Sequence, residues 1–90
     1  MGKFTDYLKA FITTKTSMGL NPDVFMPVMH RKLIRDANEY EERYTEIMQF
    51  HDGKPPAEYT SLLESLLFVA RSEREKATDL RQLIDSGWKP

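Results

Sequence analysis

The stretch from Leu62 to Ala70, which reads LLESLLFVA, is the most apolar part of this chain of 90 residues. At about 100° per residue, Leu63, Leu66 and Ala70 share one side of a helix, whereas Phe68 points almost to the opposite side. One neighbouring helix cannot cover both sides. The stretch therefore predicts a helix with a second contact surface.

Apolar residues continue the helical pattern around this stretch, from about residue 56 to residue 86. Two coiled-coil-like heptad positions recur along it. Tyr59, Leu66, Glu73 and Leu80 hold one position, and Leu63, Ala70, Ala77 and Ile84 hold the other. Gly87 is suited to follow the helix, because glycine adopts the left-handed conformation common after a C-terminus. We expect one long helix here.

A second long helix is expected from about residue 22 to residue 51. Asn21 supplies a capping side chain, and Pro22 suits the first helical position. Pro27 either kinks this helix or marks its true start after an irregular segment. Residues 52–56, which read DGKPP, then end it and begin a tight connection to the third helix.

A short amphipathic helix is expected over residues 4–16, because apolar residues recur there at helical spacing. The residues of this stripe are Phe4, Tyr7, Leu8, Phe11 and Ile12. We interpret the stripe as packing onto the body of the protein. The alternative is a helix lying on a membrane surface, with its lysines reaching the headgroups.

Together these elements predict an all-α fold: a short N-terminal helix followed by a long antiparallel helical hairpin. Residues 1–90 form a single helical domain in this interpretation. A turn centred on residues 53–54 places Ala37 opposite Ala70. The same register brings Lys32 near Glu75, so opposite charges are expected to meet across the seam.

The first helix is long enough to cover only the open end of the hairpin, defined here as residues 1–36 and 71–90. It leaves the outer surface of the turn-side half, residues 37–70, uncovered. Two hairpins packed through that half as a four-helix bundle would cover it, so we expect a homodimer. The predicted interface, with a second copy or with a partner protein, consists of Phe50, Leu62, Leu67, Phe68 and Val69.

The overall composition is that of a soluble helical protein, with 40% hydrophobic and 30% charged residues. A formal net charge of −1 gives no general electrostatic attraction to nucleic acid or an anionic membrane. The chain has no cysteine, which fits a reducing cytoplasm and excludes thiolate chemistry. No apolar run approaches the roughly 18 residues that span a bilayer. We therefore expect a cytoplasmic protein without a membrane segment.

The charges are separated along the hairpin. The open end has eleven Lys and Arg against seven Asp and Glu, a net charge of +4, and the turn-side half has two against seven, a net charge of −5. One interpretation of the open end is a site for phosphate groups. Its residues would be His30, Arg31, Lys32, Arg35, Arg71 and Arg74. The other interpretation is that these side chains are solvated or pair within the hairpin.

No catalytic, metal-binding or cofactor-binding pattern is present in the sequence. His30 and His51 are three heptads apart, too distant to share a metal, and there is no Gly-rich phosphate loop or nucleophile motif. We therefore expect a non-enzymatic module, without a cofactor, that binds a partner protein. By analogy, small helical proteins of this kind include regulators, adaptors and inhibitors, some encoded by phages. The alternative is a protein that binds nucleic acid or a phosphorylated small molecule through its basic open end.

Overall fold

The computed structural model describes residues 2–90, which form three α-helices and no strand. Helix α1 comprises Thr5–Ser17, α2 comprises Pro22–Phe50 and α3 comprises Thr60–Asp85. A short 3₁₀ helix, η1 (Ala57–Tyr59), precedes α3. The predicted all-α fold with three helices is confirmed.

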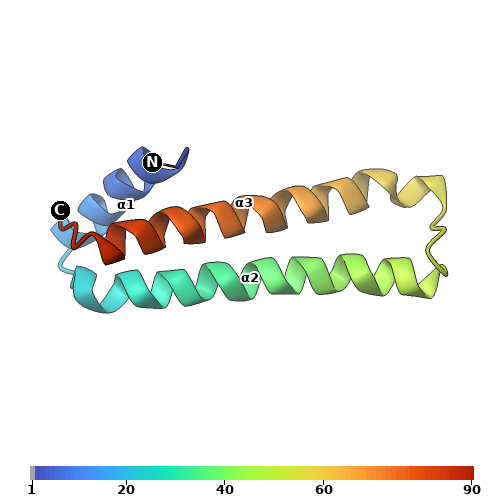
Figure 1. Ribbon diagram of the computed structural model, residues 1–90, viewed down its shortest axis with the longest axis horizontal. Helices are drawn as coiled ribbons and strands as arrows, with labels where there is room; N and C mark the ends of the chain where they lie inside the picture. The colour runs from blue at the N-terminus through green and yellow to red at the C-terminus, as the bar shows by residue number, and fades with distance from the viewer. Residues whose placement is uncertain (1) are drawn as a thin grey trace.

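Helices α2 and α3 lie side by side and run in opposite directions along an elongated molecule of 47 × 22 × 21 Å (Figure 1). Helix α1 packs against one end of this pair, close to the C-terminus of the chain. The other end, where residues 51–56 connect α2 to η1, has no third helix beside it (Figure 1). The molecule is therefore thicker at its open end than in its turn-side half.

Helix α2 begins where the sequence predicts. The Asn21 side chain accepts a hydrogen bond from the Asp23 N–H at 3.0 Å, and Pro22 is the first helical residue. The helix continues through Pro27, so a start after an irregular segment at residues 21–26 is wrong. Pro27 has no N–H to donate to the carbonyl four residues earlier, so it removes only one hydrogen bond near the N-terminus of the helix.

The connection between α2 and α3 is longer than predicted, because it includes the 3₁₀ helix η1 as well as residues 51–56. Gly53 has a φ of 79°, and its N–H donates to the Met48 carbonyl at 2.7 Å, which ends α2. Helix α3 begins at Thr60 rather than near residue 56, because residues 57–59 form the 3₁₀ turn η1. At the far end, Gly87 has a φ of 72°, as predicted for the residue after a helix.

The hydrophobic core lies at the open end, where α1 meets α2 and α3. Its most buried large side chains are Leu8, Ile12 and Leu80. The core is completed by Met26, Leu33, Ala77 and Leu83, with Phe4, Phe11, Phe25, Met29, Ile34, Ile84 and Trp88 packed against it. Helix α1 therefore covers the open end, as its short length predicts.

A buried carboxylate attaches α1 to α3. Asp79 on α3 is only 5% exposed and accepts a hydrogen bond from the Phe4 N–H at 2.9 Å. The N-cap residue of α1, Phe4, makes no capping hydrogen bond with its side chain. Asp79 thus supplies a cap from another helix, and its negative charge lies at the positive end of the α1 dipole. Gly2 lies so close to this carboxylate that an added Cβ would overlap it.

Packing is sparser in the turn-side half. The large buried side chains there are Leu63 and Leu66, alongside the small Ala37 and Ala70. Aromatic and aliphatic residues on the seam are only half-buried, which is the consequence of having two helices instead of three. The half-buried seam residues are Tyr40, Tyr44, Ile47, Met48 and Tyr59.

Candidate interaction surfaces

The residues predicted to form an interface include the most exposed aromatic side chains of the turn-side half. Phe50 is 83% exposed, Phe68 is 68% exposed and Leu62 is 47% exposed. Leu67 and Val69 are half-buried. Exposed large apolar side chains also occur at the open end (Tyr7, Met18, Leu20, Val24 and Val28), but the two most exposed aromatic rings are Phe50 and Phe68. Whether these five form such a site stays a prediction.

The five residues do not share one continuous face. Leu67 lines a groove beside α2, whereas Phe68 and Val69 line a shallow depression on α3. Leu62 and Val69, seven residues apart, lie on the same side of α3. Phe50 is at the end of α2, where its ring meets His51 edge-on with centroids 4.9 Å apart. The turn-side half thus offers more than one apolar surface.

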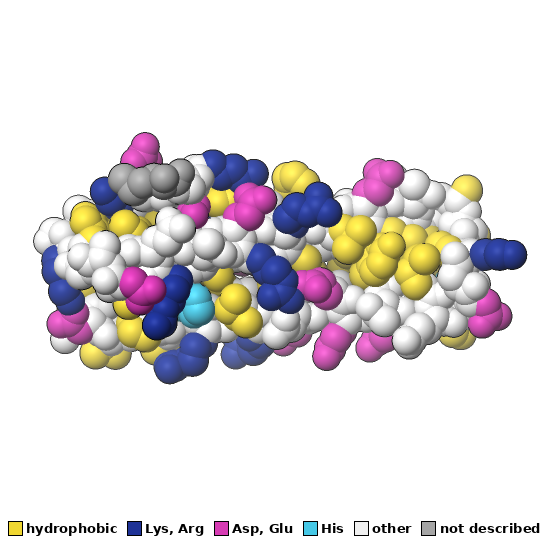
Figure 2. All heavy atoms as spheres, in the orientation of Figure 1, with side chains coloured by type: hydrophobic (Ala, Val, Ile, Leu, Met, Phe, Trp, Pro, Cys, Tyr) yellow, Lys and Arg dark blue, Asp and Glu magenta, His cyan; other side chains and the backbone are white. Residues whose placement is uncertain are grey.

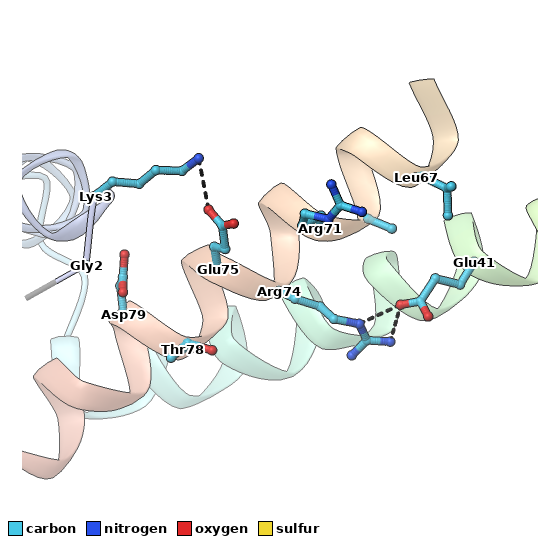
Figure 3. Close-up of a pocket in the computed structure, with 10 residues that line it drawn as sticks. Gly2, Lys3, Glu41, Leu67, Arg71, Arg74, Glu75, Thr78 and Asp79 are labelled. Atoms are coloured by element: carbon cyan, nitrogen blue, oxygen red, sulfur yellow. Dashed lines mark hydrogen bonds and ion pairs between the residues drawn. The ribbon is translucent and has the colours of Figure 1, made fainter. Parts of the chain in front are cut away.

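A groove with a volume of about 610 Å³ lies between α3, α2 and the segment before α1 (Figure 3). Leu67 and Ala70 provide apolar surface in it, and charged side chains surround them. Its lining residues are Gly2, Lys3, Glu41, Leu67, Ala70, Arg71, Arg74, Glu75, Thr78 and Asp79. Three elements far apart in the sequence therefore contribute to one concave surface.

Two of the three cations in this groove are neutralised by neighbours. Arg74 forms an ion pair with Glu41 (Figure 3). It also donates a hydrogen bond to the Asn38 Oδ1 at 2.6 Å. Lys3 Nζ lies 3.0 Å from a Glu75 carboxylate oxygen. Arg71 is exposed and forms no ion pair or side-chain hydrogen bond with residues 2–90. Its guanidinium is the cation of the groove that is available to a ligand.

The structure divides the predicted phosphate site. Arg71 and Arg74 line the groove, but the four members on α2 (His30, Arg31, Lys32 and Arg35) do not. Lys32 and Arg35 both pair with Asp36, at 2.8 Å and 3.8 Å. The hydrogen bond to Asp36, followed by its charge, raises the pKa of Lys32, because both favour the protonated amine.

One predicted ion pair across the seam is wrong. Lys32 pairs with Asp36 on its own helix, and Glu75 pairs with Lys3 from the N-terminal segment. Residues four apart on a helix face each other without any change in the backbone, so Asp36 competes successfully for Lys32. The long-range ion pair that links α2 to α3 is instead Arg74 with Glu41.

Charged and apolar side chains are distributed unevenly over the face of the molecule that Figure 2 shows. In the view of Figure 2, Lys and Arg side chains gather over the open end and the middle, and hydrophobic side chains gather over the turn-side half. Residues 2–90 contain no group of three or more His, Cys, Asp or Glu side chains placed to hold a metal ion. Over the same residues, no helix combines the length and apolar character that crossing a bilayer requires.

Comparison of the chain with protein-family models, with curated proteins and with solved structures finds no match.

Proposed function

We propose that this protein is a non-enzymatic helical interaction module that associates with itself and binds a partner protein through its turn-side half. In this proposal α2 and α3 act as an antiparallel hairpin, and two hairpins pack as a four-helix bundle. The observation that carries it is the exposure of Phe50 and Phe68, at 83% and 68%.

The uneven core supports this proposal. Helix α1 completes the packing at the open end, but only Leu63 and Leu66 are large and buried in the turn-side half. Full burial of one phenylalanine side chain stabilises a complex by roughly 1.5–3 kcal/mol. A second copy or a partner that covers this half would therefore gain several kcal/mol from the aromatic side chains that water now surrounds.

A second candidate function is the binding of phosphate groups by the groove. The unpaired guanidinium of Arg71 beside Arg74 favours it, since arginine binds phosphate well. Against it, Arg74 is held by Glu41, and Lys32 and Arg35 are held by Asp36. Salt-sensitive binding of an oligonucleotide in a mobility-shift assay, abolished by Arg71→Glu, would favour this candidate.

Light scattering after size-exclusion chromatography tests the interaction module. We expect a dimer mass for the native protein at micromolar concentration and a monomer mass for Phe68→Glu. Val24→Glu is the matched control, because Val24 is 63% exposed but lies at the open end. It should leave the dimer intact. A monomeric native protein, or equal effects of the two variants, would contradict the proposal.

A further inference from the structure

We propose that the groove lined by Leu67, Ala70 and Arg71 receives the turn-side half of a second copy. The two copies then lie antiparallel, with the open end of each beside the turn of the other, an arrangement called head to tail below. This inference rests on the self-association proposed above and adds its face, its orientation and its central charged residue. In a dimer with two-fold symmetry, each groove holds the turn-side half of the other copy. Neither groove then remains open to bind a third copy.

The separation of charge along the molecule favours this orientation. The open end has a net charge of +4 and the turn-side half a net charge of −5. Copies that lie head to tail bring the acidic half of one toward the basic end of the other. Parallel copies, with their turns side by side, would instead bring together two turn-side halves that each have a net charge of −5. Such like charges oppose association over a range of about 8–10 Å in ordinary salt.

The ion pairs within the chain leave complementary charges free on the two surfaces. Of the seven acids in the turn-side half, Glu41 pairs with Arg74. The other six are exposed and form no ion pair among residues 2–90: Glu39, Glu42, Glu46, Asp52, Glu58 and Glu64. Arg71 is the groove cation without a partner in those residues. Of these acids, Glu64 lines the depression on α3 together with Phe68 and Val69. The arrangement can therefore place an unpaired carboxylate, beside the exposed ring of Phe68, opposite the unpaired arginine of the groove.

Apolar side chains also lie nearer the turn, on the side of α2 that faces the groove. Glu41 and Met48 are seven residues apart, so they lie on the same side of α2. Glu41 lines the groove, and Met48 lines a depression with Tyr44 at the turn end. Leu67 contributes the matching apolar surface from α3. A second copy that places Phe68 against this surface buries an exposed ring and brings Glu64, which lines the same depression on α3, toward Arg71.

Charge reversal at Arg71 tests the contact. We expect Arg71→Glu to raise the dimer dissociation constant by about tenfold or more, because it places a carboxylate opposite carboxylates. Arg31→Glu is the matched control, since Arg31 is also exposed at the open end but does not line the groove. It should change the constant by less than about threefold. Added salt should weaken the native dimer, whereas copies with their turns together would be strengthened by salt.

A distance measurement tests the orientation. The chain has no cysteine, so a single spin label can be placed at Gln82→Cys, on the exposed surface of α3 at the open end. In a head-to-tail dimer the two labels should be separated by a distance comparable with the 47 Å length of the molecule, or longer. Parallel copies would bring them within roughly 20 Å, given helix spacings of 8–10 Å.

The outcomes separate this inference from the proposed function. A native protein that stays monomeric overturns both. A dimer with a short Gln82 distance, or one that tolerates Arg71→Glu as well as Arg31→Glu, overturns the head-to-tail arrangement and leaves self-association standing. A dimer with a long distance and a selective loss on Arg71→Glu supports the inference.

Discussion

Replacing Asp79 with alanine should detach the start of α1 from α3. The Asp79 carboxylate is 5% exposed and accepts the Phe4 N–H at 2.9 Å, and α1 has no side-chain cap of its own. Loss of an N-cap costs about 0.5–2 kcal/mol, and leaving a buried donor unsatisfied costs about 1–3 kcal/mol. These effects describe the same lost hydrogen bond, so we expect a total of about 1–3 kcal/mol.

The assay is urea unfolding followed by circular dichroism and by tryptophan fluorescence. Trp88 is the only tryptophan, and it packs against the core at the open end, near Lys9 of α1. Its emission therefore reports on the region that Asp79 holds together. Asp79→Asn keeps an oxygen acceptor and loses the charge near the helix dipole, so it should cost less, about 0.3–1 kcal/mol. Asp85→Ala, an exposed acid paired with Arg81, is the control.

Gly2 provides an internal check on this reasoning. A Cβ at Gly2 would overlap the Asp79 carboxylate, so Gly2→Ala should force that carboxylate away from the Phe4 N–H. In protein that already has Asp79→Ala, the same change should cost little, because the overlapping atoms are gone. The two substitutions should therefore be strongly non-additive. Additive effects, or an Asp79→Ala cost no larger than that of Asp85→Ala, would refute the capping role.

Three further substitutions test the packing and the turns, each by urea unfolding. Leu80→Ala should destabilise the fold by about 2–5 kcal/mol, because Leu80 is fully buried where the three helices meet, and a cost below about 1 kcal/mol would contradict that packing. Gly53→Ala should lower the free energy of unfolding by about 1–2 kcal/mol, since a φ of 79° is strained for any residue with a Cβ. An unchanged free energy of unfolding would show that the turn adopts another conformation. Arg74→Ala should cost only about 0–1 kcal/mol, because Arg74 and Glu41 are both partly exposed, and a larger loss would mean that this pair holds α2 and α3 together.

The helices were predictable because their signals are local. Asn21 and Pro22 mark the start of α2, and the glycines after α2 and α3 adopt the positive φ that a helix end requires. The position of α1 follows from its length, because a helix of 13 residues that ends beside the start of α2 cannot reach back to the turn-side half. Periodicity and chain length together therefore account for most of the fold.

The contacts between helices were harder to predict, because a long charged side chain can reach several oppositely charged residues. Lys32 was expected to form an ion pair with Glu75 on α3, but in the structure it pairs with Asp36 on its own helix. The cap that Asp79 provides has no signature in the sequence near Phe4, since donor and acceptor are 75 residues apart. The nearest signal was Gly2, whose missing side chain makes room for the carboxylate. Neither arrangement follows from helical spacing alone.

The candidate interface was predicted from apolar residues that no helix of the chain covers. That reasoning identified Phe50 and Phe68 as exposed side chains, but it treated Leu67 as part of the same surface. In the structure Leu67 lines the groove with Arg71. Leu67 and Phe68 lie on different surfaces because consecutive residues of a helix point about 100° apart.

Sedimentation equilibrium of the native protein at micromolar concentration tests the central claim most directly. If the turn-side half is an interface, the mass should be twice the 10.5 kDa of one chain and should fall toward 10.5 kDa on dilution. A mass of 10.5 kDa at every concentration would show that Phe50 and Phe68 are exposed in a stable monomer, which would contradict the claim that copies of this chain cover them.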